Sequence, residues 1–297
     1  MKVLIAGSGA IGLRTALECL NRNIKVVLKS KHHPLHPSTC SMGSGGLWLP
    51  FHCEGDRVNG WAKETLTELL KLVSVSASNE ECSGLALRNQ RLSAVEIVPT
   101  LLLKTENAVC GRDLYENSLP EWTKDERIHF QHMTLEMLEW QNLVYKLRLP
   151  TVEALHDAGY PYCWYYRGPV VDGPKMLANM LDEVLEHECT ESVDVDMNMN
   201  GSEFESIQDM AKMAKDLDCD AVVNCTGVGS KFFSESDGDS DDDIHGARGI
   251  LHHYDRASAE RLFPGEVDAA ILTDEGGWGT ENEPCYMVSL GILRIFT

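Results

Sequence analysis

The sequence predicts an α/β fold in which one parallel sheet is interleaved with a second domain that carries a mixed or antiparallel sheet. Three observations support this prediction. The chain opens with an apolar strand at residues 1–6, a helix at residues 11–20 and a second apolar strand at residues 24–28, which together form a βαβ unit. Another apolar strand, at residues 220–224, ends in small residues. Five aromatic residues crowd into positions 160–166, a density that is typical of a packed sheet face.

The turn between the first strand and the first helix has the pattern G-x-G-x-x-G. In a Rossmann-like unit, Gly7 takes the turn dihedrals, Gly9 lets the backbone approach a pyrophosphate, and Gly12 lets helix and strand pack closely. The N–H groups at the helix start then face the anion. We therefore predict a dinucleotide site here, and a glycine-rich turn without a ligand is the alternative. The predicted site comprises Gly7, Ser8, Gly9, Ala10, Ile11 and Gly12.

Composition bounds the class of protein. At 297 residues, 43% of them hydrophobic, the chain can bury a large core as one domain or two interleaved ones. No stretch approaches the ~20 consecutive apolar residues of a membrane-spanning helix. The formal net charge of −20 disfavours nucleic acid and anionic membranes as partners, because both are bound through an excess of Lys and Arg.

The N-terminus and the cysteines predict an intracellular protein. The glycine motif begins at residue 7, so we expect no signal peptide ahead of it. The ten cysteines form no C-x-x-C pair and have no regular spacing. We interpret them as reduced, mostly buried thiols.

Two stretches suggest a metal site and are better explained as loops. His32, His33 and His36 lie among prolines and lysines, which favours a loop over a structural metal centre. The acidic run at residues 234–243 does not have glycine and Glu at the spacing of an EF-hand loop, so a solvated loop is preferred to a calcium site. We predict no bound metal.

Hydroxyls and glycines crowd together at residues 38–50 and end in a tryptophan. Such a segment can lay backbone N–H groups and small hydroxyls along a phosphate or a flat ring. A plain turn before the helix predicted at residues 61–72 is the alternative, but it does not by itself need three glycines in four residues. Residues 82–168 have an irregular pattern, and helices are predicted at 175–185 and 207–217.

Four motifs, spread over nearly the whole chain, together resemble the D-amino-acid oxidase family of flavoproteins. They are the glycine motif at residues 7–13, the Gly-Leu-Trp-Leu-Pro segment at 46–50, the strand Val-Asn-Cys-Thr-Gly-Val at 223–228, and Arg248-Gly249 with the Ile-Leu-Thr strand at 271–273 downstream. The second and third motifs, at these separations, are much more specific than the first.

The resemblance implies FAD as cofactor and two interleaved domains. A discontinuous FAD-binding domain would span residues 1–75 and 170–230, and a substrate-binding domain residues 76–169 and 231–297. Ser8, Ala10 and Ile11 would lie near the pyrophosphate, with Cys40 and Ser41 continuing that cradle. By the same resemblance, the residues near the isoalloxazine ring would be Gly45, Gly46, Leu47, Thr226 and Gly227.

The resemblance also implies the reaction, which is oxidation of a D-amino acid to a 2-oxo acid and ammonia, with O2 reduced to hydrogen peroxide. The partners would then be a small-molecule D-amino acid and O2, and a homodimer is left open. The family resemblance suggests a peroxisomal location, but residues 295–297 are not a peroxisomal tripeptide. A cytoplasmic location therefore stays open.

The chain departs from the family pattern in three places. After the second strand, Lys29 and Ser30 stand where the family has an acid for the adenosine ribose, so restoring the acid with Lys29→Asp is expected to tighten FAD binding. Of the family's two active-site tyrosines, only Tyr286 is available, as a carboxylate contact or as a buried strand tyrosine. The family's carboxylate-binding arginine and its final glycine-rich turn have no counterpart before Thr297, and Arg294 comes too early in the pattern.

These departures lead to two expectations and two alternatives. We expect slow or absent turnover of D-amino acids by these 297 residues and an open edge on the strand at 287–290. One alternative is an NADP-dependent reductase in which Lys29 and Lys31 meet a 2′-phosphate. The other is a non-catalytic relic of a flavoprotein fold.

Overall fold

The computed structural model separates into two compact units, each made of two stretches of chain. The first unit comprises Met1–Ser44 and Gly173–Arg248, and the second comprises Gly45–Asp172 and Gly249–Thr297. The structure describes residues 1–44, 46–50, 57–79, 94–104, 119–145, 151–157, 159–160, 162–195, 204–233, 251–253, 270–274, 286–289 and 293–296.

The unit boundaries differ from the predicted domain boundaries, chiefly at residues 45–75. This stretch lies in the second unit because its backbone pairs with the sheet there. The Val171 amide donates to the Gly46 carbonyl at 2.8 Å, and the Trp48 amide donates to the Pro169 carbonyl at 3.0 Å. Which unit binds FAD and which binds substrate stays a prediction.

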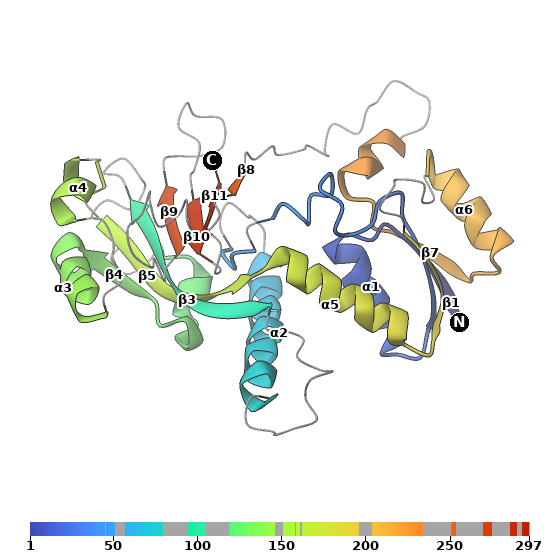
Figure 1. Cartoon of the computed structure of the whole chain (residues 1–297), viewed down its shortest axis with the longest axis horizontal. Helices are drawn as coiled ribbons and strands as arrows, with labels where there is room; N and C mark the ends of the chain where they lie inside the picture. The colour runs from blue at the N-terminus through green and yellow to red at the C-terminus, as the bar shows by residue number, and fades with distance from the viewer. Residues whose placement is uncertain are drawn as a thin grey trace. The chain divides into compact units, whose positions relative to one another are not determined.

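The first unit is built on a four-stranded parallel sheet (Figure 1). Its strand order is β6-β2-β1-β7, so the strands predicted at the start of the chain pair in register with the strand predicted at 220–224. The predicted parallel sheet is confirmed. The strands are β1 (Lys2–Ala6), β2 (Lys25–Lys29), β6 (Thr190–Asp194) and β7 (Ala221–Asn224).

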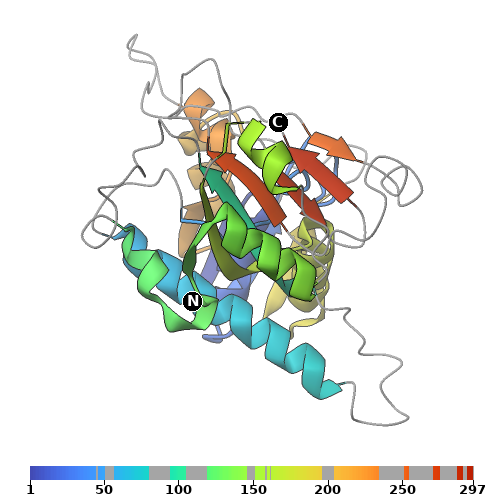
Figure 2. The same ribbon diagram turned by 90° about the vertical axis from the view of Figure 1, so that its left-hand side faces the viewer.

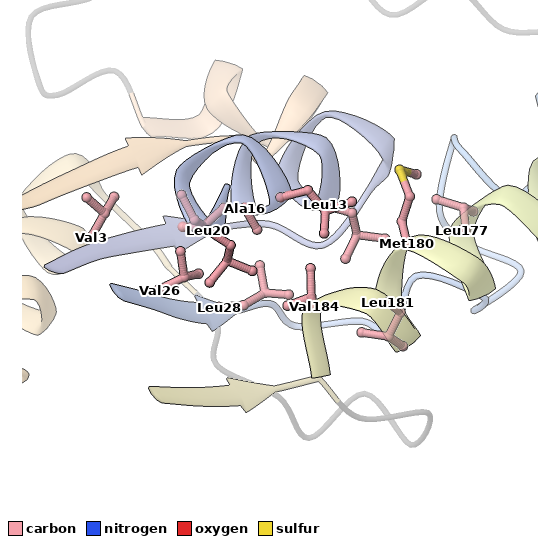
Figure 3. Packing of buried hydrophobic residues seen from close by; sticks show 12 residues of the cluster. Val3, Leu13, Ala16, Leu20, Val26, Leu28, Leu177, Met180, Leu181 and Val184 are labelled. Atoms are coloured by element: carbon pink, nitrogen blue, oxygen red, sulfur yellow. The ribbon is translucent and has the colours of Figure 1, made fainter. Parts of the chain in front are cut away.

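Helices cover both faces of this sheet. On one face, α1 (Ala10–Leu20) and α5 (Gly173–Glu186) pack side by side over β1 and β2, as Figure 3 shows. On the other face, α6 (Ile207–Asp216) packs Ala214 against Leu4 and Val27. The buried side chains of α1 and α5 recur every three or four residues, the period of an amphipathic helix: Leu13, Ala16, Leu17, Leu20, Leu177, Met180, Leu181 and Val184.

The solvent side of these helices carries the polar pattern that the sequence leads one to expect. Glu18 accepts ion pairs from Arg14 at 2.7 Å and from Arg22 at 2.8 Å, both at i,i+4 spacing on α1. The hydroxyl of Ser206 caps α6 by accepting the Asp209 amide at 3.0 Å. The predicted helices at 175–185 and 207–217 are confirmed.

The second unit is built on a seven-stranded mixed sheet with the order β4-β5-β3-β9-β10-β11-β8. Only the β3–β9 pair is parallel among the described pairs of this sheet, and the rest are antiparallel. The mixed sheet was predicted, and it is confirmed. The strands are β3 (Val95–Lys104), β4 (Gln131–Thr134), β5 (Tyr162–Val171), β8 (Leu251–His253), β9 (Ala270–Asp274), β10 (Tyr286–Ser289) and β11 (Leu293–Phe296).

Two hydrophobic clusters bury the two faces of this sheet, and Figure 2 shows helices lying against it. On one face, α3 (Leu135–Tyr145) and α4 (Val152–Asp157) pack on β3 and β5. On the other, α2 (Val58–Asn79) and the 3-10 helices η3 (Glu121–Lys124) and η4 (Glu126–Ile128) enclose an aromatic cluster. Burial raises the pKa of the Tyr166 hydroxyl. The aromatic residues of 160–166 therefore pack a sheet, as expected, on both its faces.

The expected open edge is wrong for the strand at 287–290. β10 pairs with β9 on one side, Tyr286 opposite Leu272, and with β11 on the other, Tyr286 opposite Phe296. Residues 82–168, whose sequence pattern is irregular, contain β3 and most of β5, which pair in unbroken register over ten residues each.

Candidate functional site

At Gly7 and Gly12, neighbouring backbone atoms leave no room for a side chain. Gly7 has φ +109°, and a Cβ there would lie 2.3 Å from the carbonyl oxygen of Cys225. A Cβ on Gly12 would lie 1.9 Å from the carbonyl oxygen of Gly7, closer than any real contact. The turn role predicted for Gly7 and the packing role predicted for Gly12 are therefore confirmed.

Gly9 differs from these two glycines, because it borders open space. It is the N-cap of α1 with φ −67° and ψ −176°, and a Cβ there would meet only the Ser41 hydroxyl, at 3.1 Å. The first turn of α1 holds no acidic side chain, so nothing negative from that turn opposes an anion at this terminus. Ile11 is 72% exposed here.

Hydroxyl groups tie the flanking loops to this turn. The Ala10 amide donates to the Ser41 hydroxyl at 3.0 Å, which brings the segment predicted to continue the cradle onto the helix N-terminus. The buried hydroxyl of Ser8 donates to the His32 carbonyl at 2.8 Å. Ser8 therefore holds the loop that follows β2. Cys40, beside Ser41, is exposed.

The Asn-Cys-Thr-Gly motif closes the same edge of the sheet. The Cys225 amide donates to the Ala6 carbonyl at 2.8 Å, so β7 ends directly beside the glycine turn. The Asn224 side-chain oxygen accepts the amide of Thr226 at 3.1 Å and its hydroxyl at 2.7 Å. This network fixes Thr226 just before Gly227, which has φ +61° and begins the 3-10 helix η5 (Gly227–Phe233).

The Gly-Leu-Trp-Leu-Pro segment belongs to the second unit. Gly46 has φ +62°, and a Cβ there would lie 2.0 Å from the Val171 carbonyl oxygen. Leu47 forms an isolated bridge with Val170, and the Trp48 indole N–H donates to the Ala62 carbonyl at 3.1 Å. The segment therefore pairs with the C-terminal end of β5 rather than forming a plain turn. Gly45 lies outside the described residues.

Lys29 forms an ion pair with Asp194 within the protein. Its Nζ lies 3.0 Å from Asp194 Oδ2, and its side chain is 19% exposed while that of Asp194 is 40% exposed. The Ser30 amide donates to the Asp194 carbonyl at 3.0 Å. A second carboxylate at position 29 would therefore face Asp194, so the expected gain in FAD affinity from Lys29→Asp no longer follows.

Asp194 was missed by the sequence interpretation. The strand that contains it, Thr190–Asp194, reads T-E-S-V-D and is short and polar. The available signal was the position of this strand in the chain. Three residues separate it from α5, the helix that packs on β2. Because consecutive elements are usually neighbours in space, a strand directly after that helix is expected to join the sheet of β2.

Tyr286 is placed by its strand register alone. Tyr286 pairs with Leu272, and Val288, two residues on, pairs with Arg294. Because alternate residues and paired residues share a face, positions 286 and 294 belong to the sheet face of Leu272, which is the face of the aromatic cluster. The role of Tyr286 stays a prediction.

Other candidate ligands gain no support. The His32 and His36 rings stack with centroids 5.1 Å apart, and no group of three metal-binding side chains occurs among the described residues. The acidic run at 234–243 and Arg248 lie outside them. None of the helices in the described part of the chain is both long and apolar enough to cross a membrane. Of the described cysteines, Cys163 is buried, Cys40 is exposed, and Cys19, Cys189, Cys219 and Cys225 are intermediate.

The residues of the first unit fit the pyrophosphate of a dinucleotide. The helix N-terminus, the Ser41 hydroxyl and the end of β7 meet at one edge of a parallel sheet, outside the carboxyl ends of its strands. A Cβ at Gly9 would reach the Ser41 hydroxyl and nothing else within 4 Å, so that hydroxyl is the nearest group to this approach. These features define a dinucleotide-binding α/β protein.

Comparison with known proteins narrows this class to one family. The family model described as DAO, FAD dependent oxidoreductase, matches residues 2–278. The chain therefore belongs to the family of FAD-dependent oxidoreductases, and FAD is its cofactor. The NADP-dependent alternative receives no support from this match.

Solved structures share the fold across nearly the whole chain. Glycine oxidase from Bacillus cereus ATCC 14579 has a TM-score of 0.54 and 14% identity, with 100% of this chain and 70% of that chain covered. Iminodiacetate oxidase from Chelativorans sp. BNC1 has a TM-score of 0.53 and 12% identity, with 99% of this chain and 71% of that chain covered. L-proline dehydrogenase from P. horikoshii has a TM-score of 0.51 and 10% identity, with 99% of this chain and 68% of that chain covered. At these identities the likeness shows the fold alone.

Proposed function

We propose that the protein catalyses FAD-dependent oxidative deamination of D-amino acids, giving a 2-oxo acid, ammonia and hydrogen peroxide. The family match supports oxidation with FAD. The similar solved structures include enzymes named for glycine, iminodiacetate and L-proline, all of which contain a carboxylate and an amine on one carbon. A small amino acid is thus the substrate class that the comparisons favour.

The cofactor is held, in this proposal, by backbone groups of the first unit. The N–H groups of Gly9 and Ile11 face the pyrophosphate, and Gly7 and Gly12 shape the turn that aims them. The Ser41 hydroxyl accepts the Ala10 amide and keeps its own proton to donate to a phosphate oxygen. Thr226 and Gly227, positioned by Asn224, complete this set, and Gly45, Gly46 and Leu47 are assigned to the ring end.

The reaction requires that the substrate be held with its Cα–H aimed at the cofactor. When bound, FAD would supply the oxidation chemistry, which is hydride removal from Cα coupled to reduction of O2 to hydrogen peroxide. The protein must bind the carboxylate and hold the amine deprotonated so that the imino acid forms and is hydrolysed by water. We assign the carboxylate contact to Tyr286, with Arg294 as the cationic partner that shares its sheet face.

The observation that carries this proposal is the glycine turn, where Gly7 and Gly12 have no room for a side chain and a Cβ at Gly9 would meet only the Ser41 hydroxyl within 4 Å. The test is an absorption spectrum of the purified protein, followed by a hydrogen peroxide assay. We expect flavin bands. Peroxide release on a panel of neutral, basic and acidic D-amino acids would support Arg294 as the cationic partner and would overturn the slow or absent turnover that the sequence leads us to expect. Glycine, iminodiacetate and L-proline form the second arm. Turnover confined to that arm would replace the D-amino acid assignment, and a protein without flavin bands that also binds no added FAD would sink the proposal.

A further expected result concerns Cys40. We expect bound FAD to protect the exposed Cys40 thiol from iodoacetamide, because residues 40 and 41 lie beside the N-terminus of α1. Peptide mass spectrometry after labelling at pH 8, with and without FAD, measures the protection.

The control thiol for this experiment is Cys163. Burial raises the pKa of the Cys163 thiol to about 12, so it stays protonated and unlabelled in both samples at pH 8. If Cys40 is labelled at the same rate with and without FAD, residue 40 lies outside the cofactor site.

A further inference from the structure

The carboxyl end of β2 lacks the acid that dinucleotide-binding folds use for the adenosine ribose. That acid accepts hydrogen bonds from the ribose hydroxyls, and a lysine ammonium, which has donors only, cannot. Here Lys29 is the last residue of β2. The next strand of the sheet, β6, ends in Asp194, which is paired in register with Lys29.

Asp194 lies at the same edge as the glycine turn, linked to it through Lys29. The Gly7 amide donates to the Lys29 carbonyl at 2.8 Å, and the Ser30 amide donates to the Asp194 carbonyl at 3.0 Å. Neighbouring strands are about 4.8 Å apart, so β6 lies only one strand spacing beyond the end of β2. A dinucleotide whose pyrophosphate lies at Gly9 has its ribose over this part of the sheet edge.

The ion pair presents its negative partner to the outside. The Asp194 side chain is 40% exposed and the Lys29 side chain 19% exposed, so the ammonium is the more covered member. A carboxylate only accepts hydrogen bonds, and the 3.0 Å contact with Lys29 Nζ orients it. Its 40% exposure leaves the carboxylate accessible to the hydroxyl groups of a ribose.

We propose that Asp194 is the carboxylate that binds the adenosine ribose of FAD, with Lys29 as the residue that positions it. The proposal rests on the proposed FAD-binding function and adds the residue that recognises the AMP half. It also explains why a lysine at the end of β2 need not select a 2′-phosphate. Asp194 neutralises Lys29 at 3.0 Å, and a second anion would be repelled by the same carboxylate.

The sheet offers a matched control at its opposite end. Lys25 at the start of β2 pairs with Glu191 of β6 at 2.7 Å, so the same two strands carry two Lys–acid pairs. Only the Lys29–Asp194 pair lies at the edge of the glycine turn. Glu191 also lies 3.5 Å from Lys2 Nζ of β1, so removing its charge tests what losing cross-strand ion pairs does by itself.

The experiment is a titration of the apoprotein with FAD, followed by flavin fluorescence, for the unaltered chain and for Asp194→Asn and Glu191→Gln. We expect Asp194→Asn to raise the Kd for FAD by about 10- to 100-fold, the value of a charged hydrogen bond, and Glu191→Gln to leave it within about 2-fold. The titration is repeated with an FAD analogue that lacks both adenosine ribose hydroxyls. For this analogue, we expect Asp194→Asn and the unaltered chain to have the same Kd.

A charge-swapped variant tests the positioning role of Lys29. Lys29→Asp alone puts two carboxylates side by side, so we expect weaker FAD binding. Combining it with Asp194→Lys restores the pair with the acid on β2, and we expect the Kd to return to within about 3-fold of the unaltered chain. If the double variant binds FAD no more tightly than the weaker of the two single variants, the positioning role of Lys29 is overturned.

The outcomes separate this inference from the function on which it rests. Absence of FAD binding by the unaltered chain overturns the proposed function and the inference together. FAD binding by the unaltered chain with no loss in Asp194→Asn overturns the inference alone. An equal loss for FAD and for the analogue also overturns it, because the effect then does not involve the ribose.

Discussion

Replacing Gly9 by valine is expected to abolish FAD retention while leaving the fold intact. Its backbone, at φ −67° and ψ −176°, is extended and open to any residue. The added Cβ meets only the rotatable Ser41 hydroxyl, at 3.1 Å, so the apoprotein can accommodate it. The methyl groups then occupy the space through which a pyrophosphate reaches the helix N–H groups, and the Kd for FAD should rise at least about 100-fold.

The matched control for this variant is Gly60→Val. Gly60 is an exposed glycine of α2, and a Cβ there would meet nothing within 4 Å. Flavin content after purification and an FAD titration measure binding, and circular dichroism checks folding. Unchanged flavin content in a folded Gly9→Val protein would contradict the site.

The second large effect is on stability, and it belongs to Gly12. An added Cβ would lie 1.9 Å from the Gly7 carbonyl oxygen and 2.8 Å from the Gly7 carbonyl carbon. Both are backbone atoms of the turn, so α1 must move away from the sheet that its leucines pack on. We expect Gly12→Ala to lower the free energy of unfolding by about 3 kcal/mol, and to weaken FAD binding as a consequence.

Urea unfolding of the apoprotein measures this loss, with Gly60→Ala as the comparison. Alanine in a helix stabilises by about 0.5–1 kcal/mol over glycine when no contact opposes it, so the two variants should shift stability in opposite directions. A Gly12→Ala protein as stable as the unaltered chain would show that α1 and the turn do not pack as closely as the 1.9 Å approach requires.

Much of the first unit follows from local pattern. The strand, turn, helix and strand at the start of the chain are predicted by apolar periodicity and by glycine spacing, and β1, α1 and β2 fall where the pattern puts them. The Asn-Cys-Thr-Gly strand is likewise predicted and pairs with β1. These elements were accessible because each signal is contained in a window of about ten residues.

The second unit was harder to predict because its pairing partners are far apart along the chain. β3 contains Pro99 within an otherwise apolar run and reads as a broken pattern, yet it pairs with β5 over ten residues. The strands β10 and β11 are four residues each, too short to show a period. Their register, not their sequence, places Tyr286 and Arg294 on the face of Leu272.

The sequence by itself determined where side chains are forbidden. Gly7 and Gly12 are required by dihedrals and close approaches within one turn, and such local demands leave a local signature. Only the tertiary structure decided which strand lies beside β2, and hence that Lys29 meets Asp194, 165 residues away. Parallel pairing is set by how a crossover helix packs on the sheet, and the composition of the two strands carries no record of it.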